Sequence, residues 1–309
     1  MAHLSENWND LLEPAFYKIF DGEYTRFTEK KSMLSVLFGQ KTSKRSYEKD
    51  SSAGALGDWE TFSGTIGYSD TNLGYDRRYE FAEKVQGTKI ERKLYDDDLF
   101  NIMNKRPAQL GYSGARTREK SGAEIFNNAF TSEPSSTLGG PLDSSGNPTE
   151  LCASDQCNSG DGATQSNEGT TALSATAVET TRRLMIGFRG DRSEAISINP
   201  DTIIVPLALE ETAWEIINSK GKIDTADNNA NFHFGKYKLI VWPVFLTDTN
   251  NWFLVDYDYM KQCLLWWDRI VPEFFQDKDS DTLLAKYCGY MRYGLGWNDW
   301  RWIFGNLVS

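Results

Sequence analysis

Long apolar runs are missing from this sequence. No stretch approaches the roughly 20 apolar residues that a membrane-spanning helix needs. The start of the chain also lacks the basic segment followed by an apolar segment that marks a secretory signal. We therefore expect no membrane partner, and a setting in the cytoplasm or in a virus particle.

Histidine is nearly missing, with two residues in a chain of 309. A Ser/His/Asp triad would have to rest on His233, because His3 lies at the start of the chain, and no nucleophile-elbow sequence accompanies His233. The sequence also has no phosphate-binding loop and no dinucleotide-binding glycine motif. We therefore expect a protein that is not an enzyme and has no cofactor.

Cysteine is scarce as well, with four residues. Cys152 and Cys157 lie in a Gly/Ser-rich stretch and are close enough to pair or to bind a metal. Two sulfurs without a nearby histidine do not complete a tetrahedral site, so we expect no metal. Cys263 and Cys288 lie in apolar, strand-like runs and are expected to be buried thiols.

Acidic residues outnumber basic ones: the chain has 44 Asp and Glu and 33 Lys and Arg, which gives a net charge of -11 at pH 7. Strong binding to nucleic acid regardless of its sequence requires clustered Lys and Arg that attract phosphates. The overall charge argues against such a binder.

The longest plausible helical run, residues 94–130, organises the rest of the chain. Carboxylates at 96–98 can cap its start, and Pro107 is expected to break or kink it. After the proline, Leu110 and Ile125 share one helical face with small residues, so we expect other backbone to come close to that face. The small residues are Gly114, Thr117 and Ser121. The pattern predicts a long spine helix that is stabilised by the elements lying across it.

Residues 51–93 have the alternation of two β-strands, near 59–68 and 75–85, on either side of the turn-prone segment SDTNLG. This pattern predicts a long hairpin with too little apolar surface to form a core of its own. Because an isolated hairpin is marginally stable in water, either the same chain or an adjacent copy must hold it.

The flanking segments are less regular. Residues 1–50 begin with a short amphipathic segment, which is either a first helix packed on its own domain or an arm on a neighbouring subunit. Residues 131–175 are rich in Gly, Pro, Ser, Asn and Thr, and are expected to form a surface excursion.

Residues 173–258 have the pattern of a helix, a buried strand, a second helix and two more strands. Thr176 and Glu179 have capping-box spacing at the start of the first helix. This order indicates a compact α/β domain. Two long aromatic strands at 263–270 and 282–297 follow, and we expect them to sandwich the spine together with the hairpin.

Taken in order, several segments resemble the major capsid proteins of tailed bacteriophages, and most closely the major head subunits of Mu-like phages. The resemblance covers about residues 54–305, apart from the variable stretch 139–172. The segments are ERKLYDDDLFNIMNKR, ARTREK, FNNAF, INPDTIIVPLALEETAWEII, FLVDYD, WWDRIVPEF and YGLGWNDWRWIFG.

The resemblance implies an α+β fold of the Hong Kong 97 type. Its expected parts are an N-terminal arm (1–50), an extended-loop β-hairpin (51–93), a peripheral domain with spine helix and variable loop (94–172), an axial domain (173–258), and the closing strands of the peripheral domain with the C-terminus (259–309). It also implies a structural virion protein that is assembled in the host cytoplasm. Copies of it would form hexamers and pentamers of an icosahedral shell around double-stranded DNA, with scaffolding, portal and decoration proteins as further partners.

On this hypothesis the hairpin lies across the neighbouring subunit, since closed shells repeat such heterologous contacts. The expected contact residues, facing Asp and Glu of the next copy, are Trp59, Tyr68, Tyr75, Arg77 and Arg78.

Two alternatives stay open, a monomeric phage adaptor and a carbohydrate-binding module. In the second, Trp and Tyr would stack on sugars, and pairs such as Glu210 with Glu211 or Asp256 with Asp258 would act as acid and base. Glu210 and Glu211 in a first helical turn can cap the helix or complement its dipole, and tryptophans in alternating strands are usual in a core or an interface, so neither feature requires catalysis.

Overall fold

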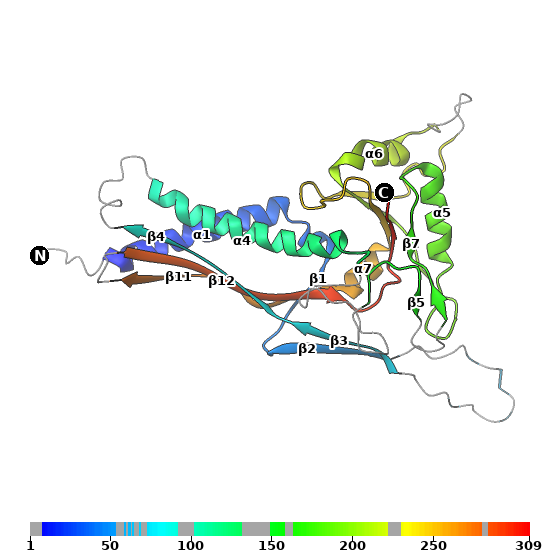
Figure 1. Ribbon diagram of the computed structural model, residues 1–309, viewed down its shortest axis with the longest axis horizontal. Helices are drawn as coiled ribbons and strands as arrows, with labels where there is room; N and C mark the ends of the chain where they lie inside the picture. The colour runs from blue at the N-terminus through cyan, green and yellow to red at the C-terminus, as the bar shows by residue number, and fades with distance from the viewer. Residues whose placement is uncertain are drawn as a thin grey trace, which may run out of the picture.

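The computed structural model describes residues 8–53, 59, 61, 62, 64, 68, 73–91, 102–131, 149–157, 163–221, 230–279 and 284–309. The chain forms an elongated body, in which two long helices lie along a four-stranded sheet, and a compact domain at one end of the body (Figure 1). A two-stranded hairpin leaves the body near the compact domain. No helix of the described ranges is both long and apolar enough to cross a membrane.

The sheet of the body has the strand order β1-β11-β12-β4. β11 (Leu264–Asp279) and β12 (Leu284–Trp297) form its centre, β4 (Ala82–Glu91) pairs with β12, and β1 (Gly39–Thr42) lies parallel to β11. The register of β11 shifts between Ile270 and Glu273, on either side of Pro272. Proline cannot donate to the ladder, so a bulge at this position is expected.

The helices α1 (Trp8–Lys31) and α4 (Ile102–Asn127) pack on each other as well as on the sheet. Phe16, Phe20 and Phe27 of α1 are buried. At Gly111 of α4, an added Cβ would clash with the carbonyl oxygen of Phe20, so the two helices approach closely there. The short helix α2 (Leu34–Leu37) follows α1. Of the two alternatives for the N-terminal segment, the structure shows a helix packed on its own chain.

Pro107 was expected to break or kink the spine helix, and of these two outcomes the break does not occur. α4 is continuous from Ile102 to Asn127, and Pro107 is buried within it. A proline at the sixth position of a helix removes the hydrogen bond that its N–H would make to the carbonyl four residues before it, and its ring crowds that carbonyl. Packing against α1 and the sheet outweighs that loss. The carboxylates expected to cap the spine, at 96–98, lie outside the described residues.

The compact domain has a five-stranded sheet with the order β7-β13-β10-β8-β9. The strands are β7 (Glu168–Gly169), β8 (Thr202–Val205), β9 (Lys238–Val241), β10 (Trp252–Val255) and β13 (Ile303–Asn306). The helices α5 (Ala175–Ile186) and α6 (Glu210–Asn218) flank it, with the single 3₁₀ turn η2 (Leu207–Leu209) before α6. β5 (Gln156–Cys157) and β6 (Thr164–Gln165) form a separate ribbon, and α7 (Tyr257–Cys263) leads into β11.

Two details of this domain differ from the sequence prediction. β13 belongs to the compact sheet and not to the closing strands of the body, because its four residues are buried between β10 and β7. The cap of α5 is Ser174, whose side chain accepts a hydrogen bond from the Ala177 N–H at 3.1 Å. Glu179, expected to complete a capping box, instead pairs with Arg182 and Arg183.

The hairpin differs most from the prediction. β2 (Tyr47–Ala53) pairs with β3 (Leu73–Glu80), whereas β4 joins the body sheet through β12. The hairpin therefore begins before residue 51 and ends at Glu80. The strand expected at 59–68 lies largely outside the described residues; Trp59, Phe62 and Tyr68, which are described, are not in a strand. Alternation shows that a segment is a strand, but it does not show which strand is its partner.

Candidate functional site

Arg77 anchors the base of the hairpin to the body. Its side chain is 3% exposed, and the guanidinium lies 4.6 Å from the ring centre of Tyr79 and 5.4 Å from that of Trp297. Its Nη2 donates to the carbonyl oxygen of Leu295 at 3.3 Å. The guanidinium occupies the space that a side chain at Gly296 would take. Burial lowers the pKa of Arg77 to about 10.

A hydrogen-bonded chain next to Arg77 holds both strands of the hairpin. The Tyr79 hydroxyl donates to Oδ1 of Asn298, and Nδ2 of Asn298 donates to Oδ2 of Asp50. Asp50 lies on β2 and Tyr79 on β3, while Asn298 follows the end of β12. The root of the hairpin is thus hydrogen-bonded to Asn298, the residue that directly follows β12 of the body sheet.

The predicted contact residues fall into two groups. Arg77 is buried against its own chain, so the prediction that it reaches a neighbouring subunit has to be corrected. Arg78 is exposed, 3.4 Å from Glu80 and with its guanidinium 4.4 Å from the ring centre of Tyr47. Trp59 and Tyr68 are exposed. The side chain of Tyr75 lies outside the described residues.

Large aromatic side chains are exposed between the two strands of the hairpin. Trp59 is 101% exposed, Phe62 73% and Tyr68 93%. In contrast, Trp242, Trp252, Trp266 and Trp302 are fully buried. Exposed aromatic residues in one short stretch are typical of a surface that another molecule covers.

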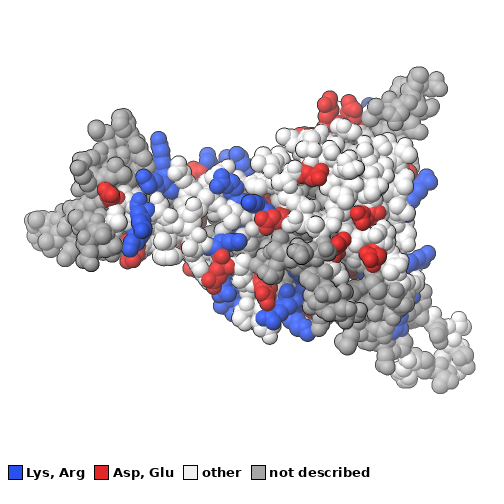
Figure 2. All heavy atoms as spheres, in the orientation of Figure 1, with Lys and Arg blue, Asp and Glu red and all other residues white. Residues whose placement is uncertain are grey.

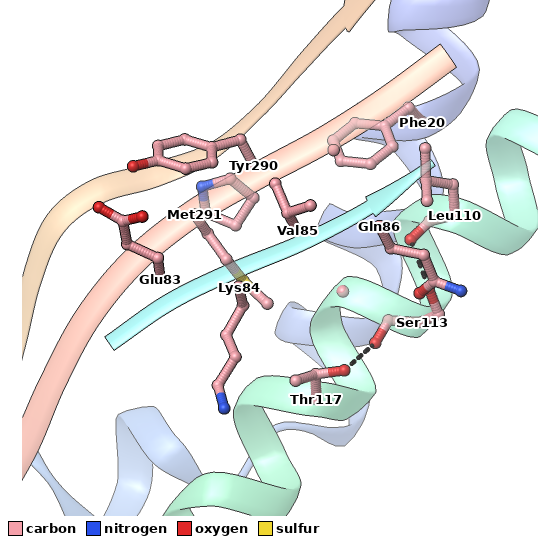
Figure 3. A pocket seen from close by; sticks show the side chains of 13 residues that line it. Phe20, Glu83, Lys84, Val85, Gln86, Leu110, Ser113, Thr117, Tyr290 and Met291 are labelled. Atoms are coloured by element: carbon pink, nitrogen blue, oxygen red, sulfur yellow. Dashed lines mark hydrogen bonds between the residues drawn. The ribbon is translucent and has the colours of Figure 1, made fainter. Parts of the chain in front are cut away.

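A cavity of about 250 Å³ lies between α4 and the body sheet (Figure 3). Phe20 and Leu110 line one end, and Lys84 and Thr117 lie toward the other. The Ser113 hydroxyl donates to Oε1 of Gln86 at 2.9 Å, which joins α4 to β4 beside the cavity. The remaining lining residues are Glu83, Val85, Gly114, Pro272, Gly289, Tyr290 and Met291.

The cavity corrects one expectation about the spine. Gly114 lies on the helical face that was expected to meet other backbone, but an added Cβ there would have no atom within 4 Å. The close approach occurs about one turn earlier, at Gly111. Of the small residues on this face, Gly114 and Thr117 line the cavity, whereas Ser121 is buried and shares a hydrogen bond with the Tyr293 hydroxyl at 2.8 Å.

The outer face of α4 is basic, although the chain as a whole is acidic. Lys105, Arg116 and Lys120 are exposed and Arg106 is half-buried, and part of this face lines an open groove of about 950 Å³ between α1, α4 and β4. Figure 2 shows Lys and Arg gathered over the elongated body, with acidic side chains more prominent on the compact domain.

The carboxylates considered as acid and base lie at the starts of two helices. Glu210 and Glu211 are exposed in the first turn of α6. Asp256 caps α7 by accepting from the Tyr259 N–H at 3.1 Å, and Asp258 is exposed in the first turn of the same helix. His233 is buried, and burial lowers its pKa.

The described cysteine side chains do not form part of a metal site. Cys152 is a buried free thiol, and burial raises its pKa well above the usual range; the side chain of Cys157 lies outside the described residues. Cys263 is a buried thiol as predicted, whereas Cys288 is only half-buried. Within the described ranges, no three His, Cys, Asp or Glu side chains come together as a metal site would require.

Comparison with known proteins gives one family. Residues 75–306 match the family described as phage capsid protein. No curated protein sequence matches the chain.

Several solved capsid structures are similar over nearly the whole chain. The capsid of Ralstonia phage GP4 has 11% identity and a TM-score of 0.59, with 91% of this chain and 92% of that chain covered. The capsid of Cyanophage P-SCSP1u has 13% identity and a TM-score of 0.56, with 91% and 89% covered. The mature capsid of bacteriophage PhiM1 has 10% identity and a TM-score of 0.54, with 90% and 87% covered. At such low identities the likeness concerns the fold.

Proposed function

The chain belongs to the phage capsid protein family, and from this premise we propose that its copies form hexamers and pentamers that close an icosahedral shell around double-stranded DNA. It is a structural major capsid protein with the α+β fold of the Hong Kong 97 type, and it is part of the virion. Its assembly takes place in the host cytoplasm, and it acts without catalysis. The more specific kinship with Mu-like phages stays a prediction.

The hairpin carries this proposal. Its root is held by Arg77 and Asn298, while Trp59, Phe62 and Tyr68 further along are exposed. A hairpin that is fixed at one end and exposes aromatic rings suits a contact with the next copy. Contacts of this kind, repeated around symmetry axes, close a shell. Trp59, Tyr68, Tyr75 and Arg78 stay our proposed contact residues.

The basic face of α4 supports the proposed enclosure of DNA. Lys105, Arg106, Arg116 and Lys120 offer charges to phosphates without reading base edges, so the contact would be independent of DNA sequence. Replacing Lys105, Arg116 and Lys120 together by glutamine should lower the slope of log binding constant against log salt by about 3 on duplex DNA. An unchanged slope would exclude this face as the DNA contact. Scaffolding, portal and decoration proteins are the further partners that we propose.

Assembly is tested by negative-stain electron microscopy and sedimentation of the purified protein, alone and from cells that also express the neighbouring head genes. Shells, tubes, or rings of five or six subunits are expected. A stable monomer under all these conditions would contradict the proposal and favour the alternative of a monomeric phage adaptor.

A charge reversal at Arg78 tests the role of the hairpin. Arg78→Glu should weaken assembly and leave the monomer folded, because the Arg78 side chain is 58% exposed. Arg183→Glu on α5 is the matched control, since it removes another exposed arginine with one acidic partner. Normal shells from Arg78→Glu would remove Arg78 from the contact.

A further inference from the structure

Two glycines face the cavity between α4 and the body sheet from opposite sides. Gly114 lies in the middle of α4, and Gly289 lies in the interior of β12. Glycine is among the least favourable residues in a helix interior, and it also weakens a strand. Both positions therefore reduce the stability of the elements that carry them.

Nothing in the chain itself requires a glycine at either position. A Cβ at Gly114 would have no atom within 4 Å, and a Cβ at Gly289 would have its nearest atoms at 3.7 Å, an ordinary contact. Neither residue has a positive φ. Gly111 differs, since a Cβ there would clash with the backbone of Phe20. What Gly114 and Gly289 have in common is that they keep the cavity open.

The size and lining of the cavity suit an aromatic ring with a polar edge. An apolar cavity of about 150 Å³ takes up a benzene molecule, so about 250 Å³ is enough for a larger ring. Phe20, Leu110 and Met291 provide apolar walls. Lys84 and Gln86, which lie on the face of β4 toward α4, offer a cation for the ring face and an amide oxygen that can accept from an indole N–H.

We propose that this cavity receives the Trp59 side chain of a second copy of this chain. The proposal rests on the proposed function, because it names the surface on which the neighbour's hairpin lands. Trp59 is 101% exposed in its own chain, whereas four other tryptophans are fully buried. Each subunit thus has both an exposed indole and a cavity large enough for a ring. In an assembly of identical copies, the indole of one copy can enter the cavity of the next.

The Trp59 of the same chain cannot reach the cavity. β3 and β4 follow one another in nearly the same direction, so the end of the hairpin at Leu73 and the cavity at Val85 lie at opposite ends of this path (Figure 1). Twelve extended residues span roughly 40 Å. Ala53, which pairs with Leu73, is followed by only six residues up to Trp59, which reach about 20 Å at most.

A matched pair of glycine substitutions tests the cavity. Gly114→Leu fills it, whereas Gly22→Leu adds the same side chain to an exposed site of α1 that also has no atom within 4 Å. Both variants should unfold at the same or higher urea concentration than the wild type. Gly114→Leu is expected to lower the yield of shells at least tenfold, and Gly22→Leu to leave it unchanged. Equal yields from the two variants would overturn the proposal.

A crosslink between copies tests the identity of the occupant. Trp59→Cys copies, co-assembled with Gly114→Cys copies, should give a disulfide-linked dimer on oxidation, and Trp59→Cys copies with Gly22→Cys copies should not. Absence of the first dimer from assembled particles would overturn the assignment to Trp59. So would a Trp59→Ala variant that assembles normally while Gly114→Leu does not, because another group would then fill the cavity. If the wild type itself never assembles, it is the proposed function that fails.

Discussion

Replacing Arg77 by glutamate is expected to destabilise the subunit itself, in contrast to the same change at Arg78. Arg77 is 3% exposed and packs on the rings of Tyr79 and Trp297, whereas the Arg78 side chain is 58% exposed. The two residues are neighbours on β3 and carry the same charge. Their different burial alone should separate a folding defect from an assembly defect.

The size of the effect follows from burial. The pKa of Arg77 falls from 12.5 to about 10 because its charge is removed from water. At about 1.4 kcal/mol per pKa unit, this corresponds to roughly 3 kcal/mol against the charged form. A carboxylate at the same place would be buried as well, and it would lose the hydrogen bond to Leu295 and the two ring contacts. An unpaired buried charge costs about 3 to 5 kcal/mol of the free energy of unfolding.

Methionine is the informative second variant at this position. Arg77→Met removes the buried charge and keeps an unbranched side chain over the two rings, so the free energy of unfolding should change by about 1 kcal/mol or less. Arg78→Glu should change it by no more than about 0.5 kcal/mol, as is usual for an exposed site.

Urea unfolding followed by tryptophan fluorescence measures these differences. The midpoint for Arg77→Glu should fall steeply, and the midpoints for Arg77→Met and Arg78→Glu should stay near the wild type. A wild-type midpoint for Arg77→Glu would refute the buried anchor at the base of the hairpin.

Three further predictions concern the body and the compact domain. Gly111→Ala should lower the free energy of unfolding by about 1 to 3 kcal/mol, because the new Cβ clashes with the Phe20 carbonyl oxygen. The control Gly22→Ala should not lower it, because a Cβ there has no atom within 4 Å. Equal urea midpoints of the two variants would contradict the close approach of α1 and α4. Asp268→Ala should cost about 3 to 5 kcal/mol, since it leaves the buried Arg118 without the carboxylate that it contacts at 2.7 and 3.0 Å. The double variant with Arg118→Met should recover much of this loss, and additive losses would exclude the pairing. Burial raises the pKa of Tyr237 from 10.0 to about 12, so its contribution to stability is complete below pH 10 and is lost as the pH rises toward 12. Tyr237→Phe should therefore flatten the alkaline fall of the urea midpoint, and an unchanged fall would assign it to other groups.

Elements with a strong local pattern could be predicted from the sequence. The helix near 176–188, the buried strand at 203–205 and the two long aromatic strands all occur close to their expected places. Their apolar spacing depends only on neighbouring residues. The partner of each strand does not, which is why the hairpin was placed on the wrong segment and β13 in the wrong sheet.

The site was predictable only in part. Arg77, Tyr79 and Phe81 are two residues apart, so their side chains point to the same face of the chain, and all three are buried. The two aromatic residues were therefore a signal that Arg77 points inward. No such signal exists for the cavity. Its volume depends on Gly289 standing opposite Gly114, a distance of 175 positions along the chain that no local pattern reveals.

The place of β13 has a consequence for synthesis of the protein. Residues 303–306 leave the ribosome after every other strand of the compact sheet, yet they lie between β7 and β10. Until they arrive, β10 has an open edge, and open edges invite wrong pairing and capture by chaperones or proteases. A chain whose translation stops before residue 303 cannot complete this domain. The order of synthesis and the order of the strands in this sheet are therefore different, and the centre of the sheet is filled after its flanking strands have been made.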